Sequence, residues 1–83
     1  MDQPEERFDI LRRIEDLSLA KLEELTGIDQ KRWGTVKRRA GKMRAEEIQA
    51  LCKAFPEYTM WIASGEEQAD AGQISPMTKL LQK

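Results

Sequence analysis

Apolar residues recur at steps of three and four along most of the chain, which is the spacing that places them on one face of an α-helix. Phe8, Leu11 and Ile14 form the first such stripe, and Leu19, Leu22 and Leu25 form the second. Further stripes follow in the second half of the chain. Together they predict helices over Glu5–Leu17, Leu19–Thr26, a third beginning after Asp29, Met43–Phe55, and Tyr58–Ser64.

The residues between these stripes are typical helix boundaries. Ser18 can cap the second helix, and Asp29 is a good N-cap for the third. Gly27 supplies the left-handed conformation that ends a helix and allows a sharp turn. Trp33 and Val36 lie three residues apart, so we expect them to face the core with Ile28, while the charged residues of the third helix face outward.

The last part of the chain has a different character. Residues 66–73 are polar and rich in Gly and Ala, which indicates a linker or a mobile tail. Ser75 and Pro76 can start a short final helix that runs to about Gln82. The sequence therefore predicts an all-α domain over residues 5–65, followed by a tail or short docking or dimerisation helix over residues 66–83.

Composition argues against several classes of protein. Cys52 is the only cysteine and there is no histidine, so we expect no disulfide, no metal site, no cofactor and no catalytic nucleophile with its base. Cys52 itself falls on the inward face of its helix and is expected to be inert. The acidic N-terminal residues lack the basic and apolar parts of a signal peptide, and no run of about 18 apolar residues could span a membrane. We expect a cytoplasmic, non-enzymatic protein.

Charge is unevenly distributed along the chain, although the net charge is only −1. Residues 30–44 contain seven Lys and Arg and no Asp or Glu, whereas residues 1–29 contain four basic and nine acidic residues. A folded domain that concentrates positive charge in this way has one face suited to phosphate and other faces that repel it. The pattern favours nucleic acid as the partner.

The central segment resembles the Xre family, the group of lambda- and Cro-type repressors. The resemblance covers Leu17 to about Gly65, and it is carried by Leu17–Asp29 (LSLAKLEELTGID), the basic segment after it, and Trp61–Gly65 (WIASG), where the family often has Trp-Leu-x-x-Gly. It implies a compact five-helix lambda-repressor-like helix-turn-helix domain. Among members of the family, the chain is most similar to short phage- or prophage-type regulators of bacteria.

The resemblance also implies roles for particular residues. The outward side chains of the recognition helix would contact base edges in the major groove, and the cations that follow would hold the DNA backbone. The implied base-contacting residues are Gln30, Lys31, Arg32 and Thr35. The implied backbone-contacting residues are Lys37, Arg38, Arg39 and Lys42.

The chain departs from the family after the recognition helix. The family usually has Glu-x-Gly-x there, whereas this chain has Lys37-Arg38-Arg39 and reaches Gly41 two residues late. Gly34 also replaces the usual Ser or Thr inside the helix. Gly34 costs roughly 1 kcal/mol relative to Ala, and either close packing or a tolerated weak position can explain it. We expect the analogy to fail first between Gly34 and Gly41.

A helix-turn-helix domain of this kind is expected to act as a homodimer on a palindromic operator. The apolar residues left over in the fifth helix and the tail are the candidate dimer contacts, and these are Tyr58, Trp61, Ile62 and Leu80. The sequence thus predicts a nucleoid-associated transcriptional regulator, and repression is its expected action. Two other functions stay open, namely a protein-interaction module on the same fold, such as an antitoxin-like or adaptor domain, and RNA binding.

Overall fold

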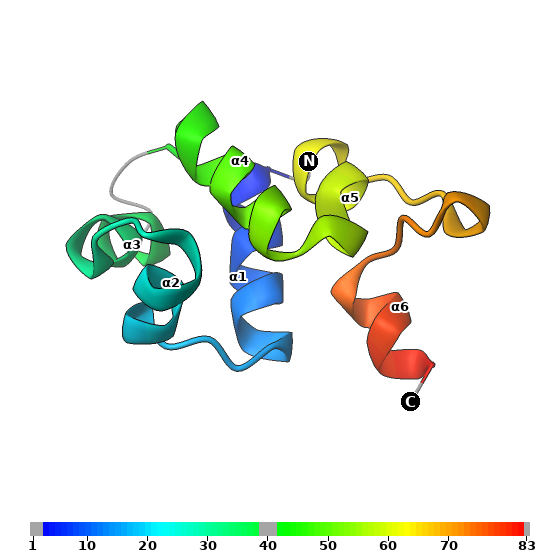
Figure 1. The fold of residues 1–83 in the computed structure, drawn as a ribbon, viewed down its shortest axis with the longest axis horizontal. Helices are drawn as coiled ribbons and strands as arrows, with labels where there is room; N and C mark the ends of the chain where they lie inside the picture. The colour runs from blue at the N-terminus through cyan, green and yellow to red at the C-terminus, as the bar shows by residue number, and fades with distance from the viewer. Residues whose placement is uncertain (1–2, 39–41, 83) are drawn as a thin grey trace.

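A computed structural model describes residues 3–38 and 42–82 of the chain. Its α-helices are α1 (Pro4–Ile14), α2 (Leu19–Thr26), α3 (Gln30–Lys37), α4 (Ala45–Ala54), α5 (Thr59–Ser64) and α6 (Pro76–Leu81), with 3-10 turns η1 (Pro56–Tyr58) and η2 (Ala69–Ala71). Helix α1 runs through the middle, with α2 and α3 to one side and α5 and α6 to the other (Figure 1). The described part of the chain has no strand, so the prediction of an all-α fold is confirmed.

One apolar core joins these helices. Trp33 of α3 is fully buried and stacks on Phe8 of α1, with ring centroids 5.3 Å apart. The Trp33 Nε1–H donates to Thr26 Oγ1 at 3.0 Å, so the one polar atom of the indole is satisfied inside the core. The prediction that Trp33 and Val36 face inward is confirmed. The buried apolar residues are Phe8, Leu11, Leu17, Leu22, Trp33, Val36, Leu51, Tyr58, Trp61 and Ile62.

Helix α1 ends three residues earlier than the sequence pattern predicts. Asp16 adopts a left-handed conformation (φ 55°), and the Leu17 N–H donates back to the Arg12 carbonyl at 2.8 Å. This is the Schellman arrangement that usually has Gly at the left-handed position. Because Asp16 stands there instead, the sequence gives no stop signal. Leu17 is still buried, but it reaches the core from the connecting segment rather than from the helix.

The segment after α5 is an ordered turn rather than a linker. Gln68 and Gln73 pair through their backbones around η2. The Gln73 side chain accepts from the Met60 N–H at 2.9 Å and donates to the Pro56 carbonyl at 3.1 Å. Helix α6 then begins at the Ser75 cap and packs on α1, with Ser75 and Pro76 buried. The short final helix predicted from Ser75-Pro76 is confirmed.

Candidate nucleic-acid interface

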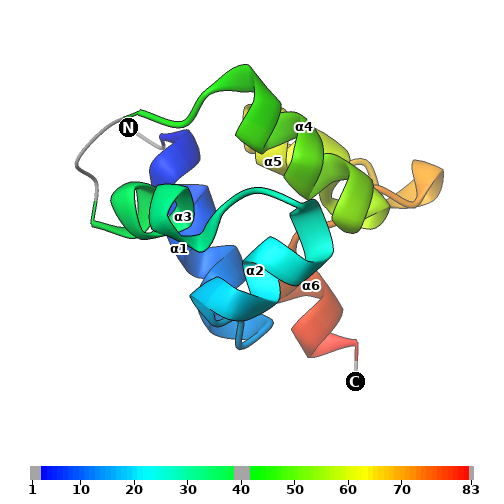
Figure 2. The ribbon, with the colours of Figure 1, turned by 60° about the vertical axis from the view of Figure 1, so that its left-hand side comes forward.

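A turn joins helices α2 and α3 (Figure 2). Hydrogen bonds hold this turn at several points. Gly27 has φ 75°, and its N–H donates to the Glu23 carbonyl at 2.8 Å. The Asp29 carboxylate accepts from the Lys31 N–H at 2.7 Å, which confirms Asp29 as the N-cap of α3. The Glu23 carboxylate accepts from the Gln30 N–H at 3.0 Å, so α2 also holds the first turn of α3. The unit is a helix-turn-helix whose second helix is hydrogen-bonded to the first through Glu23 and capped by Asp29.

The outward side of α3 borders a shallow groove of about 440 Å³. Gln30 and Lys31 are exposed at its N-terminal end, Thr35 is half-buried, and Arg38 is exposed just after the last helical residue. Helix α2 contributes Leu19 to the opposite wall. Three of the four residues expected to contact bases, Gln30, Lys31 and Thr35, therefore share one face of α3 and one groove.

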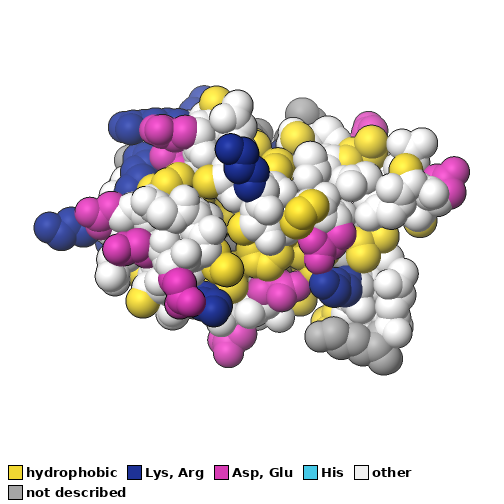
Figure 3. Space-filling model, in the orientation of Figure 1, with side chains coloured by type: hydrophobic (Ala, Val, Ile, Leu, Met, Phe, Trp, Pro, Cys, Tyr) yellow, Lys and Arg dark blue, Asp and Glu magenta, His cyan; other side chains and the backbone are white. Residues whose placement is uncertain are grey.

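Four of the cations on and after α3 have no acidic partner among the residues that the structure describes. Lys31, Lys37, Arg38 and Lys42 are exposed, and no carboxylate lies within ion-pair distance of them among residues 3–38 and 42–82. Figure 3 shows Lys and Arg side chains gathered at the end of the molecule formed by α3, beside the carboxylates of α2. Arg39, predicted to hold the DNA backbone, lies outside the described residues. Positive charge is therefore available to a ligand on the α3 side.

Arg32 was predicted to face outward and contact a base, but in the structure it pairs with Glu47. Its guanidinium donates twice to the Glu47 carboxylate, from Nε at 3.1 Å and from Nη2 at 2.9 Å, and Nη2 also donates to the Lys42 carbonyl at 2.9 Å. The Glu47 side chain is 1% exposed and the Arg32 side chain 20%. Arg32 therefore ties α3 to the start of α4 and to the segment between them, and its charge is already satisfied by protein groups.

Glu47 is the site residue that the sequence interpretation missed. It is the third residue of α4, and its carboxylate also accepts from the Arg44 N–H at 2.7 Å, as in half of a capping box. The position of an acidic residue in a first helical turn was visible in the sequence. Its pairing with a cation 15 residues earlier was not, because that contact depends on the angle between α3 and α4.

Glu47 should make the fold sensitive to acid. Burial opposes ionisation of its carboxyl group, but the hydrogen bonds from Arg32 and Arg44 outweigh it and hold the pKa below the ordinary 4.5. A group whose pKa is lowered by folding stabilises the fold above its unfolded-state pKa and loses that effect as the pH falls. We expect the unfolding temperature to drop as the pH falls below about 4.5. In Glu47→Gln the drop over this range should be smaller, and an equal drop in thermal melts followed by circular dichroism would contradict the assignment.

Gly34 is packed closely, but against side chains rather than backbone. A Cβ added there would lie 3.2 Å from Arg38 Nη1 and 3.6 Å from Leu19 Cδ1. The nearer atom is the end of a flexible, exposed side chain and can move, so the gain in helix propensity should prevail. We expect Gly34→Ala to stabilise the fold by up to about 1 kcal/mol, measured by urea unfolding. A loss of stability would mean that the Arg38 guanidinium is fixed in place.

The residues predicted to form a dimer surface lie in two different environments. Tyr58 is 0% exposed and Trp61 and Ile62 are each 4% exposed, so these three belong to the core of the single chain. Their apolar character serves folding, and this corrects the expected dimer surface. Leu80 of α6 is 53% exposed and remains accessible.

Two further observations concern other classes of site. None of the described helices is both long enough and apolar enough to cross a membrane. Residues 3–38 and 42–82 contain no group of three or more His, Cys, Asp or Glu side chains placed to hold a metal ion. Cys52 is half-buried, and burial raises the pKa of its thiol.

The fold and this surface define a small all-helical protein built around a helix-turn-helix. No family model and no curated protein matches the chain. Among solved structures, it is similar to Pf6r from the filamentous phage Pf6 of Pseudomonas aeruginosa PA01, with 30% sequence identity and a TM-score of 0.82 over 98% of this chain and 94% of Pf6r. The chain therefore belongs to the same family as Pf6r.

Proposed function

We propose that this protein is a sequence-specific DNA-binding regulator of the phage type that inserts α3 into the major groove. The observation that carries the proposal is the outer face of α3, where Lys31 and Arg38 have no acidic partner among the described residues and border one groove with Gln30. A rigid helix that presents amide and cationic groups in this way can reach base edges and phosphates. The relation to a filamentous-phage protein supports the regulatory part of the proposal.

The positions of the side chains along α3 indicate which of them contact base edges and which contact the DNA backbone. Gln30 and Lys31 form the start of α3, the part that enters the groove most deeply in a helix-turn-helix, and Thr35 borders the same groove about one turn later, so we assign these three to base edges. Lys37, Arg38 and Lys42 lie at and beyond its C-terminal end, and we assign them to the DNA backbone. Because its guanidinium is occupied by Glu47, Arg32 positions α3 instead of contacting a base.

The proposal includes a homodimer that acts as a repressor on a palindromic operator. A single α3 contacts few base pairs, and a two-fold dimer doubles the contacts. After the exclusion of the three buried residues, the support for a dimer surface comes from α6, where Met77, Leu80 and Leu81 are exposed. A repressor of this kind would act by occupying a promoter.

Selection of bound duplexes from a random DNA pool tests the proposal most directly. We expect the selected sequences to share a motif with two inverted halves, and binding to weaken steeply as salt is raised. A single half-site without its inverted copy would contradict the dimer but not DNA reading. If the purified protein binds no duplex at low salt, the DNA proposal is lost, and a protein-interaction module becomes the better explanation.

A further inference from the structure

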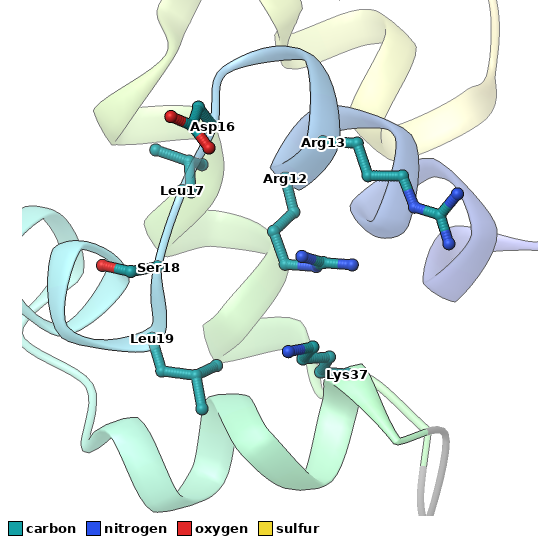
Figure 4. Close-up of a pocket in the computed structure, with 7 residues that line it drawn as sticks. All are labelled: Arg12, Arg13, Asp16, Leu17, Ser18, Leu19 and Lys37. Carbon is teal, nitrogen blue, oxygen red and sulfur yellow. The ribbon is translucent and has the colours of Figure 1, made fainter.

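A second concave site lies on the other side of Leu19 from the α3 groove. It has a volume of about 720 Å³ and is lined by Arg12 and Arg13 of α1, residues 16–19 of the connection to α2, and Lys37 of α3. In Figure 4 the side chains of Arg12 and Lys37 extend into the same space, whereas Arg13 points away from it. Two positive groups from different helices thus face one cavity.

The charges at this site are only partly balanced. Arg12 Nη2 donates to Asp9 at 2.8 Å, and the same carboxylate also pairs with Arg13 at 3.1 Å. Arg12 Nε is buried, and no acceptor is in reach of it within residues 3–38 and 42–82. Lys37 has no carboxylate within ion-pair distance in the same ranges. The remaining charged group that lines the site is Asp16, which is exposed.

These groups match an oxyanion in chemistry. A buried N–H of a charged group without an acceptor is costly, and two like charges that share a cavity repel one another. An anion placed between Arg12 and Lys37 removes both penalties. The first turn of α2, which begins at Leu19 after the Ser18 cap, adds the positive end of a helix dipole at the same cavity.

We infer that this pocket binds a phosphate of the DNA backbone next to the segment that α3 reads. The inference rests on the proposed function. Leu19 lines both the pocket and the α3 groove, so the two hollows adjoin. Lys37 lines the pocket, and the next residue, Arg38, lines the α3 groove. When a DNA duplex binds to α3, its sugar-phosphate backbone therefore lies at the pocket. This contact extends the DNA-binding surface of the protein onto α1.

The first test measures salt dependence of duplex binding by the full chain. We expect Arg12→Gln and Lys37→Gln each to weaken binding about tenfold, equally for specific and unrelated duplexes, and to reduce the slope of log K against log salt by about one. Lys53→Gln is the control, because Lys53 is an exposed lysine on α4 outside the pocket. Lys37 is exposed and makes no ion pair among the described residues, so its variant stays folded even if the loss of the Arg12–Asp9 pair affects stability.

The second test looks for a gain of binding. Asp16→Asn removes the carboxylate that lines the pocket, and Asn tolerates the left-handed conformation that Asp16 adopts. We expect duplex affinity to rise by about two- to fivefold at low ionic strength, where exposed charges are least screened. Asp70→Asn, in the remote η2 turn, is the matched control and should change affinity less.

The outcomes separate this inference from the proposed function. If the protein binds DNA but Arg12→Gln and Lys37→Gln both keep the wild-type slope and affinity, the phosphate pocket and the assignment of Lys37 to the DNA backbone are overturned. The contacts assigned to Gln30, Lys31, Thr35 and Arg38 are left standing by that result. Loss of all duplex binding in the wild type overturns both. The Arg12 Nε–H resonance in NMR distinguishes the sources of phosphate, since we expect it to shift on addition of duplex. A shift with inorganic phosphate but not with duplex would overturn the assignment to DNA.

Discussion

Glu47→Ala is expected to lower the free energy of unfolding by about 3–5 kcal/mol, which is the usual effect of removing one partner from a buried ion pair. The Glu47 side chain is 1% exposed and receives three hydrogen bonds, two from Arg32 and one from the Arg44 N–H. Without the carboxylate, the Arg32 guanidinium is left half-buried and the first turn of α4 loses its cap. The loss is large against the roughly 5–15 kcal/mol by which single domains are stable.

Urea unfolding followed by circular dichroism measures this effect. Glu46→Ala is the matched control, because Glu46 is the neighbouring carboxylate and is 67% exposed, and its ion pair with Arg44 is long at 3.6 Å. We expect the control to change stability by less than about 1 kcal/mol. If the two variants are equally stable, the Arg32–Glu47 pair contributes nothing to the fold.

The double variant Arg32→Met with Glu47→Leu shows whether the pair stabilises the fold or specifies its geometry. Well-packed apolar replacements of buried ion pairs are often as stable as the original. We therefore expect the double variant to recover most of the stability that Glu47→Ala loses. Because Arg32 also holds the Lys42 carbonyl at 2.9 Å, DNA binding should stay impaired in the double variant even when the fold is restored. Wild-type binding by the double variant would contradict the positioning role of Arg32.

The helix boundaries show which parts of this fold can be predicted from local sequence. Ser18, Gly27 and Asp29 act within a few residues of themselves, and the structure confirms the helix ends that they predict. Asp16 takes the place of a glycine in a left-handed position, so α1 ends without the usual signal. The turn over residues 68–73 was also unpredictable, because its stability comes from contacts of Gln73 with Met60 and Pro56, which are distant in sequence.

The candidate site shows the same division between local and tertiary information. The run of cations over residues 30–44 was evident, and so was the outward position of Gln30 and Lys31 on a helix. The charge pattern could not show which of these cations form ion pairs with acidic residues of the protein. Arg32 and Lys31 are adjacent in sequence, yet Arg32 turns to Glu47 and Lys31 is exposed, because helical geometry points neighbouring side chains about 100° apart. Tyr58 and Trp61 were misplaced for a similar reason, since apolar residues suit a core and an interface equally.

Lys31→Gln combined with Arg38→Gln is expected to weaken duplex binding about 100-fold. Both side chains are exposed, border the α3 groove and lack a carboxylate partner among the described residues, so their replacement should leave the fold intact. A hydrogen bond to a charged group contributes about 1.5 kcal/mol or more, and about 1.4 kcal/mol corresponds to a tenfold change in affinity. Two such contacts together therefore account for about two orders of magnitude.

Lys53→Glu is the control for this prediction because it changes the net charge by the same two units. Lys53 is exposed on α4 and lies outside the α3 groove, so a ligand on α3 should sense it only weakly and mainly at low salt. Fluorescence anisotropy with a labelled duplex at several salt concentrations separates the two cases. Equal losses in the double variant and in Lys53→Glu would mean that binding follows net charge alone. A loss confined to the double variant would tie it to the α3 surface, since the two proteins carry the same net charge and differ only in where that charge lies.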